Sequence, residues 1–236
     1  MRRDARIAVI IPALDEEQAI ARVIADLPAF VDEIVVVDNG SRDATAHAAR
    51  AAGARVVMEP ERGYGAACLA GIAALTAPDI IVFLDGDYSD DPHELDQVVA
   101  PIMRGEADLV IGSRTKGNSA PGALAPHQRF GNWLACRMIK LIWNVPYTDL
   151  GPFRAIDRRA LESLAMRERR FGWTVEMQIK AAAANLRIQE VPVSYRPRIG
   201  TSKISGTIRG SVFAGVTILT LITRSALAGA RHVARW

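Results

Sequence analysis

Cysteine is scarce in this chain, with two residues among 236. Cys68 and Cys136 lie far apart, and neither has neighbours at metal-ligand spacing. No disulfide framework is expected, and both side chains are predicted to be small buried residues in a reducing compartment. The basic amino terminus leads into a short strand-like run instead of the apolar core of a secretory signal. The catalytic part is therefore expected to stay in the cytoplasm.

Long hydrophobic runs are also missing. Residues 210–223 form a stretch of 14 uncharged residues between Arg209 and Arg224, whereas a membrane-spanning helix needs about 20. Because apolar residues such as Phe213 and Val216 are flanked by basic ones, we predict a helix that lies in the membrane interface. A buried terminal helix and a contact in a homo-oligomer are the alternatives for this segment.

Acidic residues almost disappear toward the carboxyl terminus. Residues 187–236 hold eight Lys or Arg and a single acid, Glu190, although the net charge of the chain is only +3. Such asymmetry favours an anionic partner, for which we expect a membrane surface, with a solvated basic face as the alternative. Aromatic residues make up 6% of the chain and no basic stripe interleaves with them, which argues against nucleic acid.

Short β-branched runs alternate with alanine-rich helical stretches in the first half of the chain. The runs predict strands at residues 7–11, 33–37, 55–58, 80–84 and 109–111, and helices at residues 17–27, 45–52, 64–74 and 92–103. This alternation is typical of a mostly parallel sheet with helices on both faces. We predict one catalytic domain, residues 1–206, followed by a basic, apolar helix within residues 207–236.

Two acidic residues follow the apolar run 80–84 in the sequence Asp85-Gly86-Asp87. If the run is a buried strand, both carboxylates emerge together at the edge of the sheet where α/β proteins bind ligands. Paired carboxylates suit Mg²⁺, which commonly takes one or two of them together with the phosphates of a nucleotide. Asp91, Pro92 and Glu94 predict a capped helix start just beyond, which would hold the pair in a tight loop.

Further motifs occur in a fixed order around this pair. They are Ile11-Pro12-Ala13-Leu14-Asp15-Glu16-Glu17, Val37-Asp38-Asn39-Gly40-Ser41-Arg42-Asp43-Ala44-Thr45, Arg62-Gly63-Tyr64-Gly65-Ala66, Ile111-Gly112-Ser113-Arg114, Phe153-Arg154-Ala155 and Arg198-Ile199-Gly200-Thr201-Ser202-Lys203. The set resembles family 2 glycosyltransferases, and within them the dolichyl-phosphate mannose synthase group, over about residues 6–209. The fold that the resemblance implies is a single α/β domain of the Rossmann-like, nucleotide-sugar-binding glycosyltransferase A type, with a mostly parallel mixed sheet flanked by helices.

The resemblance assigns a role to most of these residues. It implies that Asp85 and Asp87 hold Mg²⁺ or Mn²⁺ against the donor diphosphate, with Asp87 counted among the catalytic residues. The other donor-binding residues that it implies are Pro12, Leu14, Glu16, Asp38, Gly63 and Gly86. Around the acceptor phosphate it implies Arg114, which is also counted as catalytic, together with Arg129, Arg198 and Lys203.

The acceptor decides whether a general base is needed. A phosphate is already a nucleophilic anion at neutral pH, since its second pKa is about 6, so it requires cationic side chains to position it. A hydroxyl would require a base, for which Asp149 is the catalytic candidate. The motifs depart from the family at Asn39, which replaces a second acid, and at Tyr88-Ser89, which removes an amide beside the metal.

The sequence therefore predicts a metal-dependent, inverting glycosyltransferase at the cytoplasmic membrane face. It would move a hexose from GDP-mannose or a UDP-sugar to a polyprenyl phosphate. Transfer to a hydroxyl of another lipid or small molecule is the alternative within the enzyme class. A protein that binds nucleotide sugars without turnover is the alternative outside it.

Overall fold

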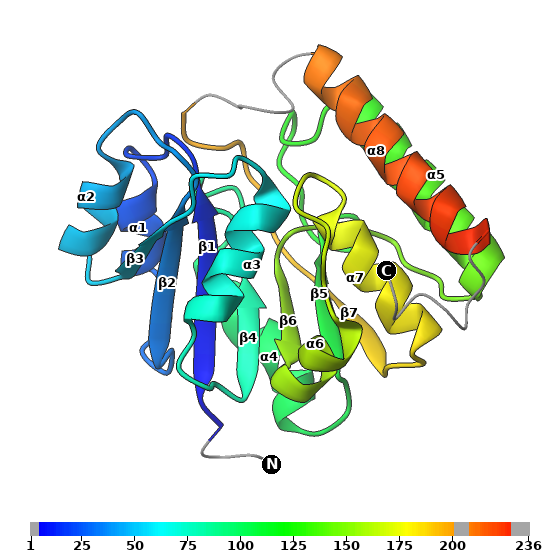
Figure 1. Ribbon diagram of the computed structural model, residues 1–236, viewed down its shortest axis with the longest axis horizontal. Coiled ribbons are helices and arrows are strands. Elements are labelled where there is room, and N and C mark those ends of the chain that lie inside the picture. Colours follow the sequence, from blue (N-terminus) through cyan, green and yellow to red (C-terminus); the bar gives the residue numbers. More distant parts are fainter. Residues whose placement is uncertain (1–4, 201–207, 228–236) are drawn as a thin grey trace.

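The computed structural model describes residues 5–200 and 208–227. Its centre is a seven-stranded sheet in the order β3-β2-β1-β4-β6-β5-β7 (Figure 1). The strands are β1 (Ile7–Ala13), β2 (Glu33–Asp38), β3 (Arg55–Met58), β4 (Ile80–Phe83), β5 (Leu109–Ser113), β6 (Arg154–Asp157) and β7 (Ile188–Pro192).

Six strands run in one direction and β6 alone is reversed. β1 pairs in parallel with β2 and β4, and β5 pairs in parallel with β7, whereas β6 is antiparallel to both β4 and β5. The sheet is therefore mixed and mostly parallel, as predicted. The carboxyl ends of β1, β2, β4 and β5 consequently meet along one edge, where ligands bind in open α/β sheets.

Helices cover both faces of this sheet. They are α1 (Ile20–Ala25), α2 (Thr45–Ala51), α3 (Tyr64–Ala74), the 3₁₀ turn η1 (Pro92–Glu94), α4 (Leu95–Met103), α5 (Pro126–Trp143), α6 (Arg158–Leu164), α7 (Trp173–Ala183) and α8 (Ile208–Leu227). One core lies between the sheet and α1, α2 and α4, and a second lies between the sheet and the remaining helices.

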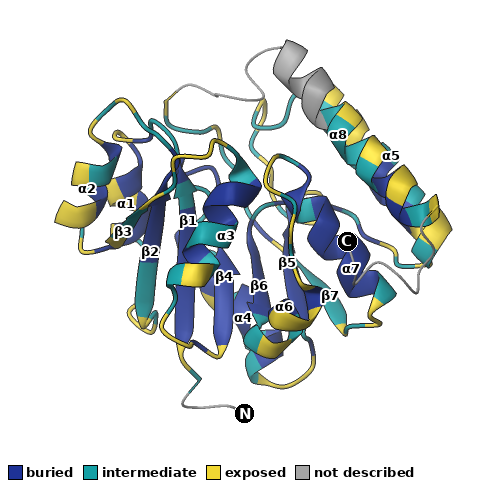
Figure 2. Ribbon diagram, in the orientation of Figure 1, coloured by how far each residue is buried: buried dark blue, intermediate teal, exposed yellow. Residues whose placement is uncertain are grey.

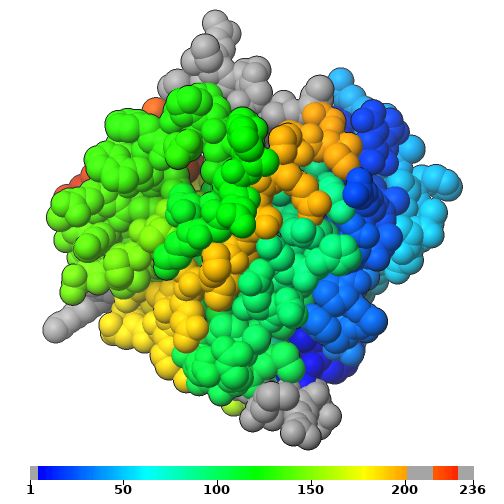
Figure 3. Space-filling view, turned by 180° about the vertical axis from the view of Figure 1, so that it is seen from behind, coloured from blue at the N-terminus to red at the C-terminus, as the bar shows by residue number. Residues whose placement is uncertain are grey.

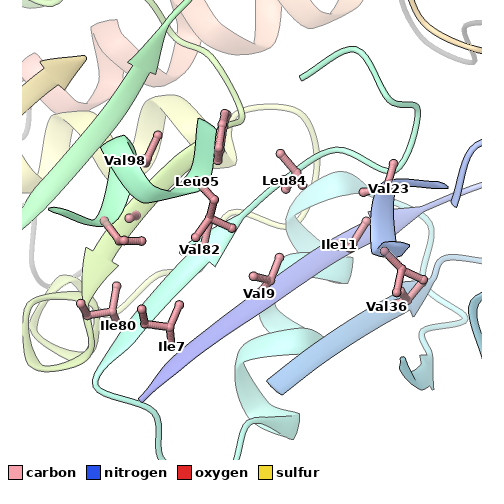
Figure 4. Close-up of a cluster of buried hydrophobic side chains, with 14 of the residues drawn as sticks. Ile7, Val9, Ile11, Val23, Val36, Ile80, Val82, Leu84, Leu95 and Val98 are labelled. Atoms are coloured by element: carbon pink, nitrogen blue, oxygen red, sulfur yellow. The ribbon is translucent and has the colours of Figure 1, made fainter. Parts of the chain in front are cut away.

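The strands supply alternate side chains to these two cores. Val9 and Val82 pack in the first core, beside Leu95 and Val98 of α4, whereas Ile10 and the other neighbours along the strands pack in the second (Figure 4). Both faces of the central strands are therefore buried, as their colouring in Figure 2 shows. This explains why the sequence gives continuous apolar runs instead of a polar alternation.

The second core contains the largest buried aromatic side chain. Trp173 of α7 is fully buried and meets the ring of Phe83 edge-on, with the ring centroids 4.5 Å apart. Phe83 is the last residue of β4, two residues before Asp85. The contact anchors α7 beneath the end of the strand that carries the candidate metal ligands.

Helix α8 lies alongside α5 and packs against both α5 and α7 (Figure 1). Ile222 is fully buried in the second core, whereas Val216 is exposed. These contacts favour the buried-helix alternative for the side of α8 that carries Ile222. The side that carries Val216 is exposed. No helix in the described part of the chain has the length and apolarity that crossing a membrane requires.

Local details confirm some sequence predictions and correct others. Both cysteines are buried and unpaired, as expected. Asp91 caps η1 by accepting a hydrogen bond from the His93 N–H. The capping box predicted at Glu94 is wrong, because that carboxylate accepts hydrogen bonds from the Ser194 backbone N–H and hydroxyl, at 2.7 and 2.8 Å. Glu94 therefore ties the helix start to the segment after β7.

Two helical glycines give a matched test of the packing. A Cβ on Gly71 of α3 would lie 2.5 Å from Ile10 Cγ2, whereas a Cβ on Gly131 of α5 would meet no described atom within 4 Å. We expect Gly71→Ala to lower the free energy of unfolding by about 1–3 kcal/mol through overpacking. Gly131→Ala should raise it by about 0.5–1 kcal/mol, because alanine is the better helix former. Urea unfolding followed by circular dichroism measures both, and equal shifts would contradict this account of α3.

Candidate active site

A cavity of about 1620 Å³ opens at the carboxyl ends of the strands. It brings together most of the residues that the sequence predicted, from segments far apart in the chain. These are Pro12, Leu14, Glu16, Gly63, Asp85, Gly86, Asp87, Arg114, Arg129 and Arg198. Asp38 and Asp149 lie outside the lining, and Lys203 lies outside the described residues.

Asp85 is separated from the end of β4 by one residue, Leu84, and faces this cavity. Its Oδ1 atom is buried and has no hydrogen-bond partner among the described residues. Burial raises the pKa of the Asp85 carboxyl to about 7, and the neighbouring Asp87 carboxylate adds to the rise. A cation at this position would favour the ionised form and would give the buried Oδ1 atom a partner.

Asp87 is held more firmly. Its Oδ1 atom accepts hydrogen bonds from the Ser89 backbone N–H at 2.9 Å and from the Ser89 hydroxyl at 2.6 Å. Its Oδ2 atom lies 3.3 Å from the Arg198 guanidinium. The serine that replaces the family amide therefore orients the carboxylate through Oδ1, which leaves Oδ2 to meet a cation.

The chemistry of this pair fits a hard divalent cation. The described residues contain no group of three or more His, Cys, Asp or Glu side chains that could hold a metal. Asp85 and Asp87 supply only part of a coordination shell for Mg²⁺ or Mn²⁺, so water or the phosphates of a nucleotide would supply the remaining oxygens. The partnerless Asp85 Oδ1 is consistent with this use.

The loops after β1 and β2 form one side of the cavity and are fastened to each other. The Asp15 N–H donates to the Ser41 hydroxyl at 2.9 Å, and the Glu16 N–H donates to the Thr45 hydroxyl at 2.8 Å. Asp38 is buried and its Oδ1 accepts from the N–H groups of Gly40 and Ser41. That carboxylate closes its own turn in the structure, and its predicted contact with the donor base stays a prediction.

Asn39, the residue after Asp38, lines the cavity, and its side chain holds part of the cavity wall in place. Its side-chain amide donates to the carbonyls of Glu59 and Glu61, at 3.0 and 2.7 Å, and its oxygen accepts from the Gly63 N–H at 2.7 Å. An aspartate could not donate to the two carbonyls. The departure from the family motif therefore has a structural reason, which the local sequence did not reveal.

Gly63 and Gly65 bring this wall close to a second loop. A Cβ on Gly63 would lie 2.1 Å from the Arg169 carbonyl oxygen, and one on Gly65 would lie 2.1 Å from that of Glu168. The second loop is held in turn by the buried Glu176, which accepts from backbone N–H groups and pairs with Lys180 at 2.8 Å. Glu176 is thus engaged in contacts that hold this loop.

The opposite wall carries the cations. Arg114 follows β5 and binds Asp149 in a two-pronged ion pair, with Nε to Oδ2 at 2.8 Å and Nη2 to Oδ1 at 2.7 Å. The Arg114 backbone N–H donates to the same carboxylate. Asp149 is completely buried, and the guanidinium stacks over the Tyr195 ring at 4.9 Å. Asp149 therefore fixes the direction of Arg114 toward the cavity.

Arg129 and Arg198 complete this group. Arg129 lies in the first turn of α5 and is exposed. Arg198 follows β7 and reaches the donor side, where it contacts Glu16 and Asp87. The structure thus places Arg114, Arg129 and Arg198 around one cavity, and their predicted contact with an acceptor phosphate stays a prediction.

Sequence reasoning assigned no role to two residues that support the basic wall, Tyr195 and Glu190. Tyr195 lines the cavity beneath Arg114, and its position just after β7 was the available signal. Glu190 of β7 accepts from the Thr148 N–H at 2.7 Å and pairs with Lys116 at 2.9 Å. Only the pairing of β5 with β7 brings Glu190 beside the loop that carries Asp149, so no local pattern could have revealed it.

A mixed sheet of this order, with an acidic pair at the end of β4 over a large cavity, defines the class as a glycosyltransferase of the A fold type. The match to the family model "Glycosyl transferase family 2" spans residues 8–165. The chain belongs to this family, whose members bind nucleotide sugars, and is an enzyme of the glycosyltransferase class.

Similar proteins agree with this assignment. An uncharacterised glycosyltransferase of Mycobacterium tuberculosis is 40% identical over 210 residues, which cover 88% of this chain and 94% of that protein. A dolichyl-phosphate hexose transferase of Haloferax volcanii is 34% identical, over 84% of this chain and 86% of its own length. Glucosyl-3-phosphoglycerate synthase of Mycobacterium tuberculosis, solved with Mn²⁺, UDP and glucosyl-3-phosphoglycerate, superposes with a TM-score of 0.76 at 26% identity, covering 94% of this chain and 81% of that one.

The amide of Asn39 provides a test of the donor-side wall. We expect Asn39→Asp to lower the free energy of unfolding by about 1–3 kcal/mol, because two carbonyls lose their donor and face a carboxylate instead. Asn185→Asp is the control, since that residue is exposed after α7. Thermal unfolding measures both variants, and equal melting temperatures would show that the amide does not hold this loop.

Proposed function

We propose that this enzyme is a metal-dependent, inverting glycosyltransferase that moves a hexose from GDP-mannose or a UDP-sugar to a polyprenyl phosphate. The observation that carries the proposal is the division of one cavity into two charged walls. Asp85 and Asp87 lie on one side, and Arg114 lies on the other with its guanidinium already oriented. This arrangement suits a donor diphosphate and a second anion in the same reaction.

Each wall would serve one reactant. Asp85 and Asp87 would hold Mg²⁺ or Mn²⁺, which supplies Lewis-acid stabilisation to the departing diphosphate. The loops after β1 and β2, including Pro12, Leu14 and Glu16, would hold the nucleotide. Arg114 and Arg198 would position the acceptor phosphate and offset the repulsion between the two anions.

The state of Asp149 favours a phosphate over a hydroxyl acceptor. Both of its oxygens accept hydrogen bonds from Arg114, and the carboxylate is completely buried. Removing a proton from a hydroxyl would require Asp149 to leave that ion pair and reach the substrate. A phosphate monoester needs no such base, since it is already anionic at neutral pH.

The relatives support the choice of substrates. The Haloferax relative is named for the transfer of hexose to dolichyl phosphate, a polyprenyl phosphate lipid. The Mycobacterium structure combines Mn²⁺ and UDP with glucosyl-3-phosphoglycerate. The first relative supports a polyprenyl phosphate acceptor for this chain, and the second supports a divalent metal and a nucleotide-sugar donor.

A lipid acceptor requires access to a membrane, and α5 offers a suitable surface. Phe130 and Trp133 are 61% and 59% exposed, with ring centroids 5.9 Å apart, and Leu141 is exposed further along the helix. Arg137 and Lys140 are exposed on the same helix, which contains no acidic residue. Exposed aromatics flanked by cations are typical of helices that lie in an anionic bilayer interface. We therefore place the enzyme at the cytoplasmic membrane face, with α5 as the contacting element.

Product chemistry tests the proposed reaction. Enzyme, membranes and radiolabelled GDP-mannose or UDP-glucose should give a lipid-extractable product that mild acid hydrolyses, because a sugar joined to a phosphate is acid-labile. Asp87→Asn should lower the rate by about 100-fold or more through loss of a metal ligand. Asp91→Asn, in the neighbouring turn, should stay within about threefold of the wild type, since its carboxylate caps η1. An acid-stable glycoside would overturn the proposed acceptor.

Vesicle binding tests the proposed membrane contact. The double variant Phe130→Ser/Trp133→Ser should reduce co-flotation with vesicles of phosphatidylglycerol and phosphatidylcholine by about tenfold, because two interfacial rings are lost. Met58→Ser is the control, since Met58 is 57% exposed but lies on the edge strand β3. Equal losses in both variants, or none in either, would remove α5 from the contact.

A further inference from the structure

The segment after β7 is attached to the loop that carries the acidic pair. The Arg196 N–H donates to the Ser89 carbonyl, and the Ile199 N–H donates to the Asp87 carbonyl, both at 2.9 Å. Figure 3 shows this orange segment between the blue amino-terminal part and the green residues of the opposite wall. The backbone thus holds Arg198 beside Asp87.

The Arg198 guanidinium bridges two carboxylates of the donor side. Its Nη2 atom lies 2.5 Å from Glu16 Oε1 and 3.3 Å from Asp87 Oδ2. Its Nε atom is buried and has no hydrogen-bond partner within the described part of the chain. The guanidinium therefore uses only part of its donor capacity where it lies, although it contributes a full positive charge.

Arg198 meets the oxygen that Asp87 would offer to a metal. Ser89 occupies Oδ1 with two hydrogen bonds, and Oδ2 is the atom that faces Arg198. A divalent cation bound to Oδ2 would lie within a few ångströms of the guanidinium and would be repelled by it. Arg198 and the metal therefore compete for the same carboxylate oxygen.

We propose that Arg198 is an internal counter-cation that gives up Asp87 when the divalent cation binds. The inference rests on the proposed function, since it concerns the same metal and acceptor sites. Arg198 lines the cavity that Arg114 also lines, so the released guanidinium is available to the acceptor phosphate. The exchange makes binding ordered: metal and donor enter first, and the acceptor site gains its second cation only afterwards.

Mn²⁺ binding in the absence of any nucleotide tests the exchange, with the free ion measured by electron paramagnetic resonance. Arg198→Gln should bind Mn²⁺ about tenfold more tightly than the wild type, because the competing charge is gone. Arg198→Lys, which keeps the charge, should stay close to the wild type. If Arg198 only stabilised the local structure, its replacement would weaken Mn²⁺ binding. Tighter binding therefore shows that Arg198 competes with the metal.

Arg196→Gln is the matched control from the same segment. Arg196 pairs with Asp91 at 2.9 Å and stacks on Tyr88, so its loss should leave the Mn²⁺ affinity unchanged. Asp87→Asn should abolish binding, which confirms the site being measured. If Asp87 is required but Arg198→Gln binds no more tightly than the wild type, the exchange is overturned and the proposed function stands. If no variant binds Mn²⁺ even with UDP or GDP, the proposed metal role and the exchange both fail.

Discussion

The burial of like charges at the end of β4 is the constraint on which the rest of the site depends. Asp85 and Asp87 follow a strand that is buried on both faces, so their carboxylates emerge in an environment that disfavours two negative charges. Asp90 adds a third buried carboxyl, without a hydrogen-bond partner among the described residues, and burial raises its pKa well above the ordinary value. Cations must balance this region, which explains why arginines approach it from β5 and from the segment after β7.

The sequence predicted the positions of these groups better than their contacts. The apolar runs located the strands in the sequence, and the ends of these strands located the residues that reach the crevice. Both can be predicted because they depend only on which residues are buried. The roles of Asp38 and Asn39 depend instead on partners elsewhere: one carboxylate bonds to its own turn, whereas the adjacent amide bonds to carbonyls some 20 residues away. Neighbouring residues of similar shape therefore differ in function for reasons that only tertiary contacts supply.

The proposed membrane contact shows the same limit. The sequence placed the interfacial helix within residues 207–236, because that segment is apolar and lies between basic residues. In the structure α8 turns Ile222 into the core and packs against α5, whose Phe130 and Trp133 then remain exposed. Two amphipathic helices that pack side by side hide part of each apolar face, and the sequence cannot say which part. Which apolar residues remain exposed therefore depends on how α5 and α8 pack together, and not on either helix alone.

The basic wall depends on a residue that does not line the cavity, Asp149. Asp149 is separated from solvent, yet it accepts two hydrogen bonds from the Arg114 guanidinium and one from the Arg114 backbone N–H, and Tyr195 supports the guanidinium from beneath. Arg198 has no such dedicated carboxylate, since its partners Glu16 and Asp87 belong to the donor side. Arg114 is therefore held in one orientation, whereas Arg198 is shared between the two walls. Under the proposed exchange, a site built in this way would sense the charge of its donor before it completes the binding of its acceptor.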